Sequence, residues 1–208
     1  MDVKTERLLL LLKNAQTQYS EEYLVIAIPG FASKKFIAYC AMKEDLELLV
    51  KYIDIIKEKP NQTIKSALTF SVISLYGKCF TDASKNRYPK LEALDLFKTE
   101  ENHATTHEML MELRHQFIAH RGETEKEIGI AFMLVPKAKP AEDSKIRFSQ
   151  LKQISFNEGE IEKIQNLVAY IIERLLEKIQ VAGQKLHAGL LKTFTPEELA
   201  MMIMNNAK

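Results

Sequence analysis

The sequence predicts a mostly α-helical bundle that carries one small antiparallel β hairpin. Apolar residues recur at spacings of three and four along most of the chain, as on one face of a helix. The 208 residues include only seven glycines and six prolines, which is few for an architecture with many turns. After Gly122 the helical spacing gives way to two strand-like runs, 128–135 and 145–154, joined by a polar loop. We expect the hairpin there and helices elsewhere.

The predicted helices follow from this spacing and from the residues at their ends. We expect them over residues 2–18, 43–59, 62–80, 90–97, 99–120 and 158–191. Asn61 and Asn157 are placed to cap two of these helices, and Pro60 ends another. The pattern Thr195-Pro196-Glu197-Glu198 is typical of a helix start and predicts a short last helix.

Three segments carry more specific expectations. The run 23–28 fits a buried strand or a helix equally well, and it is broken by Pro29 and Gly30. The helix at 62–80 is apolar on most faces, which predicts a central place in the bundle. The longest helix has a coiled-coil-like stripe that serves the bundle core and that fits a dimer face as well. Its members are Ile161, Ile164, Val168, Ile171 and Leu175, widened by Ile172, Leu176 and Ile179.

Composition limits the domain organisation and the partners. We predict one domain over residues 1–208, made of an N-terminal helical segment, 1–60, and a bundle, 61–208, with the hairpin near 127–155. Lys and Arg number 29 and Asp and Glu 28, so the formal net charge is only +1. A general nucleic-acid binder usually has a large basic excess. Any RNA contact is therefore expected to be local, brief or shared between subunits.

The sequence also predicts a soluble, cytoplasmic protein. No segment approaches the run of about 20 apolar residues that spans a bilayer, and the leucine run at 8–12 is too short for a signal peptide. Cys40 and Cys79 lack a CxxC spacing and are expected to be buried reduced thiols, although a disulfide between them stays open. We therefore expect no membrane contact.

The segment 112–121 carries the residues best suited to chemistry. It places Arg114, His115, His120 and Arg121 beside apolar residues at the end of a predicted helix. An Arg and a His near one another suit RNA cleavage, because one neutralises phosphate charge and the other transfers a proton. In an ideal α-helix Arg114 and His120 lie about 9 Å apart along the axis and about 120° apart around it. The two side chains therefore do not stack directly within one chain.

Structural roles for the same residues have to be weighed beside this one. His120 fits a residue that caps the carbonyls at a helix end, and Arg114 fits an ion pair with Glu108 or Glu112. His103 and His107 have the spacing of two metal ligands on a helix. They lack a third ligand, so two partly exposed polar residues are favoured and no metal is expected.

Arg114-His115, four further residues and His120 resemble the signature of the HEPN superfamily. That signature is an Arg, a polar residue and usually four residues before a His, inside a small helical bundle. The form Leu-Arg-His-Gln-Phe-Ile-Ala-His-Arg is similar to that of abortive-infection members. The stretch 74–82, followed by Lys85-Asn86-Arg87, also resembles the helix and link before the motif in such proteins. The resemblance covers roughly Gln62 to His120, and the long helix after Asn157 would close the bundle.

The resemblance implies an up-and-down helical core and a ribonuclease without metal or cofactor, of the toxin–antitoxin or phage-defence type. Two copies would form a homodimer whose motifs meet in a cleft. Arg114 would neutralise the scissile phosphate, His120 would act as general base or acid, and His115 would orient the Arg or share proton transfer.

Two function classes stay open. The first is this ribonuclease, with RNA as substrate and a cognate antitoxin as a protein partner. Lys78, Lys85, Arg87 and Arg121 would then guide the RNA. The second is a non-catalytic HEPN-like helical module that binds a partner protein, a nucleotide or RNA. The small net charge favours the second.

Overall fold

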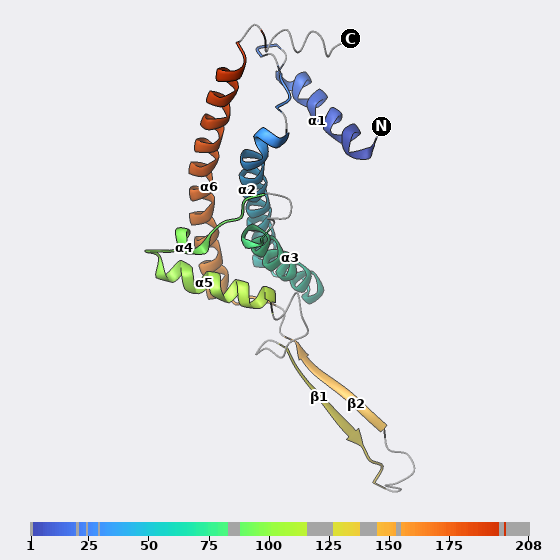
Figure 1. Ribbon diagram of the computed structural model, residues 1–208. Helices are drawn as coiled ribbons and strands as arrows, with labels where there is room; N and C mark the ends of the chain where they lie inside the picture. The colour runs from blue at the N-terminus through green and yellow to red at the C-terminus, as the bar shows by residue number, and fades with distance from the viewer. Residues whose placement is uncertain are drawn as a thin grey trace. The chain divides into compact units, whose positions relative to one another are not determined.

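The structure is a computed structural model that describes residues 2–19, 21–23, 25–28, 30–82, 88–115, 127–137, 145–152, 155–195 and 198. In these ranges the chain forms six α-helices and one two-stranded antiparallel sheet (Figure 1). In order they are α1 Val3–Tyr19, α2 Gly30–Lys57, α3 Gln62–Phe80, α4 Ala93–Leu96, α5 Glu101–Glu112, β1 Glu127–Leu134, β2 Lys145–Lys152 and α6 Glu158–Thr193. The predicted fold class, a mostly α bundle with one small hairpin, is confirmed.

The chain divides into two compact units. Residues 1–38 and 178–208 make up one, the terminal unit, and residues 39–177 make up the other, the central unit. In the terminal unit, the Asp2 carboxylate accepts the Lys4 and Thr5 backbone N–H groups at 2.8 and 3.0 Å, which starts α1. The single domain over 1–208 stays a prediction.

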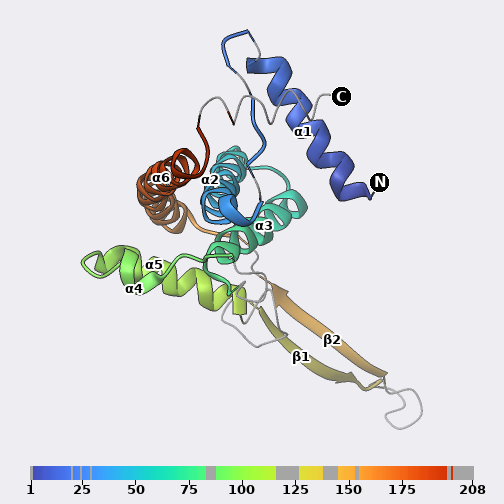
Figure 2. The same ribbon diagram turned by 45° about the horizontal axis from the view of Figure 1, so that its top comes forward.

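The core of the central unit lies between α2, α3 and α6. In both views α2 lies between α6 and α3 (Figure 2). Four apolar residues of α2 at three-and-four spacing are fully or almost fully buried: Leu46, Leu49, Ile53 and Ile56. The α6 stripe is buried as predicted at Ile161, Ile164, Val168, Ile171 and Leu175. Leu176, however, is 49% exposed, so the predicted widening of the stripe is wrong at that position.

Local capping chemistry sets the helix starts as predicted. The Asn61 side chain accepts the Ile64 N–H at 3.0 Å, so α3 begins at Gln62. Asn157 and Glu160 form a reciprocal capping box, each accepting the other's backbone N–H at 2.8 Å. Thr195 and Glu198 form a second box at 3.2 and 2.8 Å, which confirms the expected cap. The body of the last predicted helix lies outside the described residues.

Several helix boundaries differ from the predicted ones. Residues 25–28 adopt neither helix nor strand, and α2 already begins at Gly30. In α3 every buried residue comes at or after Thr69, so only its second half is central. The predicted helix 90–97 shrinks to the single turn of α4. Of the predicted helix 99–120, Glu101–Glu112 form α5 and 113–115 follow as a π-helical turn, while 116–120 lie outside the described residues. The bounds of α1, α3 and α6 agree with the predicted ones to within two residues.

The predicted hairpin is present. β1 and β2 pair in register from Glu127 opposite Lys152 to Leu134 opposite Lys145. Its large apolar side chains are exposed on both faces, as a two-stranded sheet with no third layer requires. They include Ile128, Ile130, Met133, Leu134, Ile146, Phe148 and Leu151. None of the helices in the described ranges combines the length and the apolar character that crossing a bilayer requires.

Candidate functional site

The described part of the motif lies directly after α5, in a turn of different geometry. Residues 113–115 form a π-helical turn, and Leu113 keeps right-handed helical angles, φ −57° and ψ −38°. Single π turns are rare and often occur at functional sites. Because a π turn holds more residues than an α turn, the angle of about 120° between Arg114 and His120, which assumes an ideal α-helix, does not apply here.

The Arg114 side chain lies across α3 at Gly77. A Cβ placed on Gly77 would lie 2.5 Å from Arg114 Nε and 3.1 Å from Arg114 Cγ, and it would overlap Cδ. Arg114 is half-buried in this position, whereas the neighbouring His115 is exposed. The close approach is therefore a contact between the motif and the last turns of α3.

The charge of Arg114 lacks an ion-pair partner within the described ranges. The ion pairs there join Lys43 to Glu47, Lys78 to Asp45, Lys90 to Glu92 and Arg174 to Glu177. The pairing of Arg114 with Glu108 or Glu112, weighed from the sequence, is thus not found. The C-terminal turn of α3 instead places partial negative charge nearby, which favours a cation without neutralising it.

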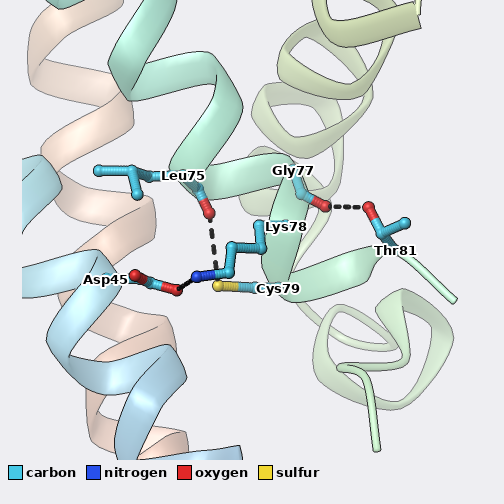
Figure 3. A network of polar contacts seen from close by, with 6 residues as sticks. All are labelled: Asp45, Leu75, Gly77, Lys78, Cys79 and Thr81. Atoms are coloured by element: carbon cyan, nitrogen blue, oxygen red, sulfur yellow. Dashed lines mark hydrogen bonds and ion pairs between the residues drawn. The ribbon is translucent and has the colours of Figure 1, made fainter. Parts of the chain in front are cut away.

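The end of α3 has two differently used sides (Figure 3). On the side toward α2, the Lys78 ammonium pairs with the Asp45 carboxylate at 2.7 Å. On the other side, the Thr81 hydroxyl donates to the Gly77 carbonyl at 2.7 Å and satisfies an otherwise open helix end. The side that carries Gly77 is thus fixed by a cap, and the side that carries Lys78 is tied to α2.

An aromatic cluster lies beside this contact, formed by Tyr76, Phe80, Phe97, His107 and Tyr170. The His107 ring lies 4.4 Å from the ring of Phe80 and 5.1 Å from that of Phe97. Its Nδ1 shares a 2.8 Å hydrogen bond with the Tyr76 hydroxyl. Burial lowers the pKa of His107 and raises that of Tyr76 well above its ordinary value, so the pair is neutral near neutral pH.

His103 and His107 are used separately. The His103 ring stacks on Tyr170 at 4.8 Å, while His107 is enclosed by α3 and Phe97. In the part of the chain that the structure describes, no group of three or more His, Cys, Asp or Glu side chains is arranged to hold a metal ion. Both histidines are half-buried, and each packs against aromatic rings.

The two cysteines are free thiols. Cys79 is buried, and its Sγ donates to the Leu75 carbonyl at 3.6 Å (Figure 3). Burial raises the pKa of Cys79 to about 12, which keeps the thiol protonated and unreactive. Cys40 is only half-buried, so the expectation of two buried thiols is right for Cys79 alone.

The remaining predicted site residues divide into two groups. Lys78 is described, and its side chain is 67% exposed although it pairs with Asp45. The Asp45 side chain of this pair is 20% exposed. Lys85, Arg87, His120 and Arg121 lie outside the described residues, and their roles stay predictions.

Sequence reasoning singled out Arg114 but missed Gly77 and Tyr76 as its surroundings. A signal was present, because a lone glycine within an apolar helix often marks a close approach of another chain segment. Which segment approaches is set by packing between helices distant in the sequence.

Comparison of the chain with protein-family models, with curated proteins and with solved structures finds no match. Membership of the HEPN superfamily therefore stays a prediction from the motif. The function has to be inferred from the contacts of Arg114 and from the chemistry of the residues around it.

Proposed function

We propose that the chain is a metal-independent endoribonuclease of the defence or toxin type, in which Arg114 and His120 act at a cleft formed by two copies. One observation carries the proposal. Arg114 is half-buried against Gly77 and has no ion pair within the described ranges. A cation that is partly removed from water and not neutralised attracts an anion more strongly than an exposed one. The RNA backbone supplies that anion.

The roles follow from the chemistry of the side chains. A planar guanidinium donates two parallel hydrogen bonds to phosphate oxygens and balances the charge that develops during cleavage. His120 removes the proton from the 2′-hydroxyl or gives one to the leaving oxygen, because an imidazole titrates near neutral pH. His115, exposed beside Arg114, orients Arg114 or shares in the proton transfer.

The aromatic cluster is compatible with the proposed cleavage chemistry. Tyr76 is fully buried, and His107 has a lowered pKa that keeps it neutral. Tyr76 is next to Gly77 in the sequence, so these groups add no competing charge near the Arg114–Gly77 contact.

The test is cleavage of total RNA by the purified chain with a chelator present. We expect the wild-type protein to cleave and the Arg114→Ala and His120→Ala proteins each to lose at least about 100-fold in rate. Arg174→Ala is the matched control, because Arg174 is already paired with Glu177 on the same helix, α6. Equal cleavage by the wild-type and Arg114→Ala proteins would contradict the proposal.

A mixing experiment tests the shared cleft. If Arg114 of one copy works with His120 of the other, a mixture of the two inactive variants forms mixed dimers that regain part of the activity. A mixture that stays inactive, although mixed dimers form, would show that each cleft needs both residues from the same chain.

A second candidate is a non-catalytic helical module that binds a protein partner such as a cognate antitoxin. The exposed apolar side chains of the hairpin favour it, among them Ile146 at 69% and Phe148 at 65% exposure. Apolar surface of this kind is typical of a binding site. Partner binding that is lost in Phe148→Lys and kept in Arg114→Ala, without any RNA cleavage, would favour this candidate.

A further inference from the structure

Gly77 stands at a position where the backbone does not need a glycine. It is buried in the interior of α3, and its φ is not positive, so any L-residue could adopt its conformation. Glycine is one of the poorest residues in a helix interior, because it loses the most backbone freedom on folding. Its presence is therefore better explained by the space that its missing side chain leaves.

The space is filled by the middle of the Arg114 side chain. Cγ, Cδ and Nε of Arg114 are the three atoms nearest to the place where a Cβ would be. A methyl group there would require Arg114 to leave its path across α3, whereas no backbone atom is among these nearest three. Because the atoms that must move belong to a side chain and not to the backbone, the helix and the fold would survive the change while the guanidinium would not stay in place.

No other described glycine has this relationship to a charged side chain. Gly183 faces the Phe36 ring at 3.3 Å, Gly129 faces Phe148, and Gly30 and Gly189 have nothing within 4 Å. Gly189, which lies in α6 as Gly77 lies in α3, therefore supplies a matched control. An alanine at 189 changes the same atoms in a helix without touching an arginine.

We propose that Gly77 is a positioning residue for Arg114. The missing side chain at 77 leaves a groove on α3 in which the Arg114 side chain lies, and this fixes where its guanidinium meets a phosphate group. The inference rests on the proposed function, and it adds a residue that acts only through Arg114. It also explains why so apolar a helix carries a glycine that contacts a motif residue 37 positions away in the sequence.

The test compares five proteins: wild type, Gly77→Ala, Gly189→Ala, Arg114→Ala and the Gly77→Ala/Arg114→Ala double variant. For each we would measure kcat and KM on one defined RNA and record circular dichroism. We expect Gly77→Ala to lower kcat/KM by about 10- to 100-fold, because misplacing a positioned group by about 1 Å has an effect of this size. Helix content should not change, and Gly189→Ala should behave as wild type.

The double variant separates positioning from folding. If Gly77 acts through Arg114, adding Gly77→Ala to Arg114→Ala leaves the residual rate unchanged. A Gly77→Ala protein that cleaves like wild type, or one that lowers the rate by the same factor in both backgrounds, would overturn the inference while leaving the ribonuclease intact. A wild-type protein that cleaves no better than Arg114→Ala would overturn the proposed function and the inference together.

Discussion

Two neighbouring residues of α3, Tyr76 and Gly77, make different kinds of contact with basic side chains. Tyr76 meets His107 inside the aromatic cluster, where burial lowers the pKa of the imidazole and favours its neutral form. Gly77 meets Arg114, whose side chain lies half-buried across α3. Tyr76 contacts His107 through its ring and its hydroxyl, whereas Gly77 contacts Arg114 only by leaving room for its side chain. Under the proposed function the first contact stabilises the fold and the second holds a charge for a ligand.

The largest expected effect is on stability, and it concerns the contact between Tyr76 and His107. Tyr76→Ala removes a fully buried ring and should lower the free energy of unfolding by about 3–5 kcal/mol. Arg114→Ala should change it by less than about 1 kcal/mol, because no ion pair is lost within the described ranges. Urea unfolding followed by circular dichroism measures both. Similar losses of unfolding free energy in the two variants would contradict the difference proposed between the two contacts.

A smaller and more diagnostic effect is expected at Gly77. In the wild-type background Gly77→Ala should destabilise the chain, since overpacking costs about 1–3 kcal/mol and the helix gains only about 0.5–1 kcal/mol from alanine. In the Arg114→Ala background the overlap is gone, so the same change should stabilise by about 0.5–1 kcal/mol. Urea unfolding of the four proteins tests this change of sign. An equal effect in both backgrounds would mean that Gly77 and Arg114 are independent.

The pH dependence of stability is expected to be smaller still. Burial lowers the pKa of His107 below its ordinary 6.5, so the unfolded chain takes up a proton at a higher pH than the folded chain does. As far as His107 is concerned, the free energy of unfolding should not change with pH above 6.5. It should fall as the pH drops from 6.5 toward the pKa of His107 in the folded chain. His107→Gln should reduce this dependence, as measured by thermal unfolding at a series of pH values. If the stability of the His107→Gln protein depends on pH as strongly as that of the wild type, groups other than His107 cause this dependence.

The comparison also shows how far the sequence could lead. Caps such as Asn61 and the Asn157–Glu160 box were predictable, because they depend on residues three positions apart. The buried stripe of α6 and the hairpin were predictable from their periods. The end of α5 was not, because the change to a π turn at 113–115 is not encoded in apolar spacing.

The candidate site was predictable only in part. Arg114 and His115 were found from a short motif. Their surroundings depend on which helix packs beside them, so neither the Gly77 contact nor the Tyr76–His107 pair followed from spacing. The pairing of Arg114 with Glu108 or Glu112, weighed from the sequence, considers only residues near in the chain. The structure places the Arg114 side chain across α3 at Gly77, 37 positions away in the sequence.

The proposed function requires that Arg114, which has no ion pair within the described ranges, serves RNA cleavage and not folding. The most direct measurement is the RNA-cleavage rate of the wild-type and Arg114→Ala proteins in a chelator, with urea unfolding recorded on the same samples. The account predicts a loss in rate of at least about 100-fold with a change in unfolding free energy below about 1 kcal/mol. An Arg114→Ala protein that cleaves as fast as wild type, or that loses activity only because it unfolds, would contradict it.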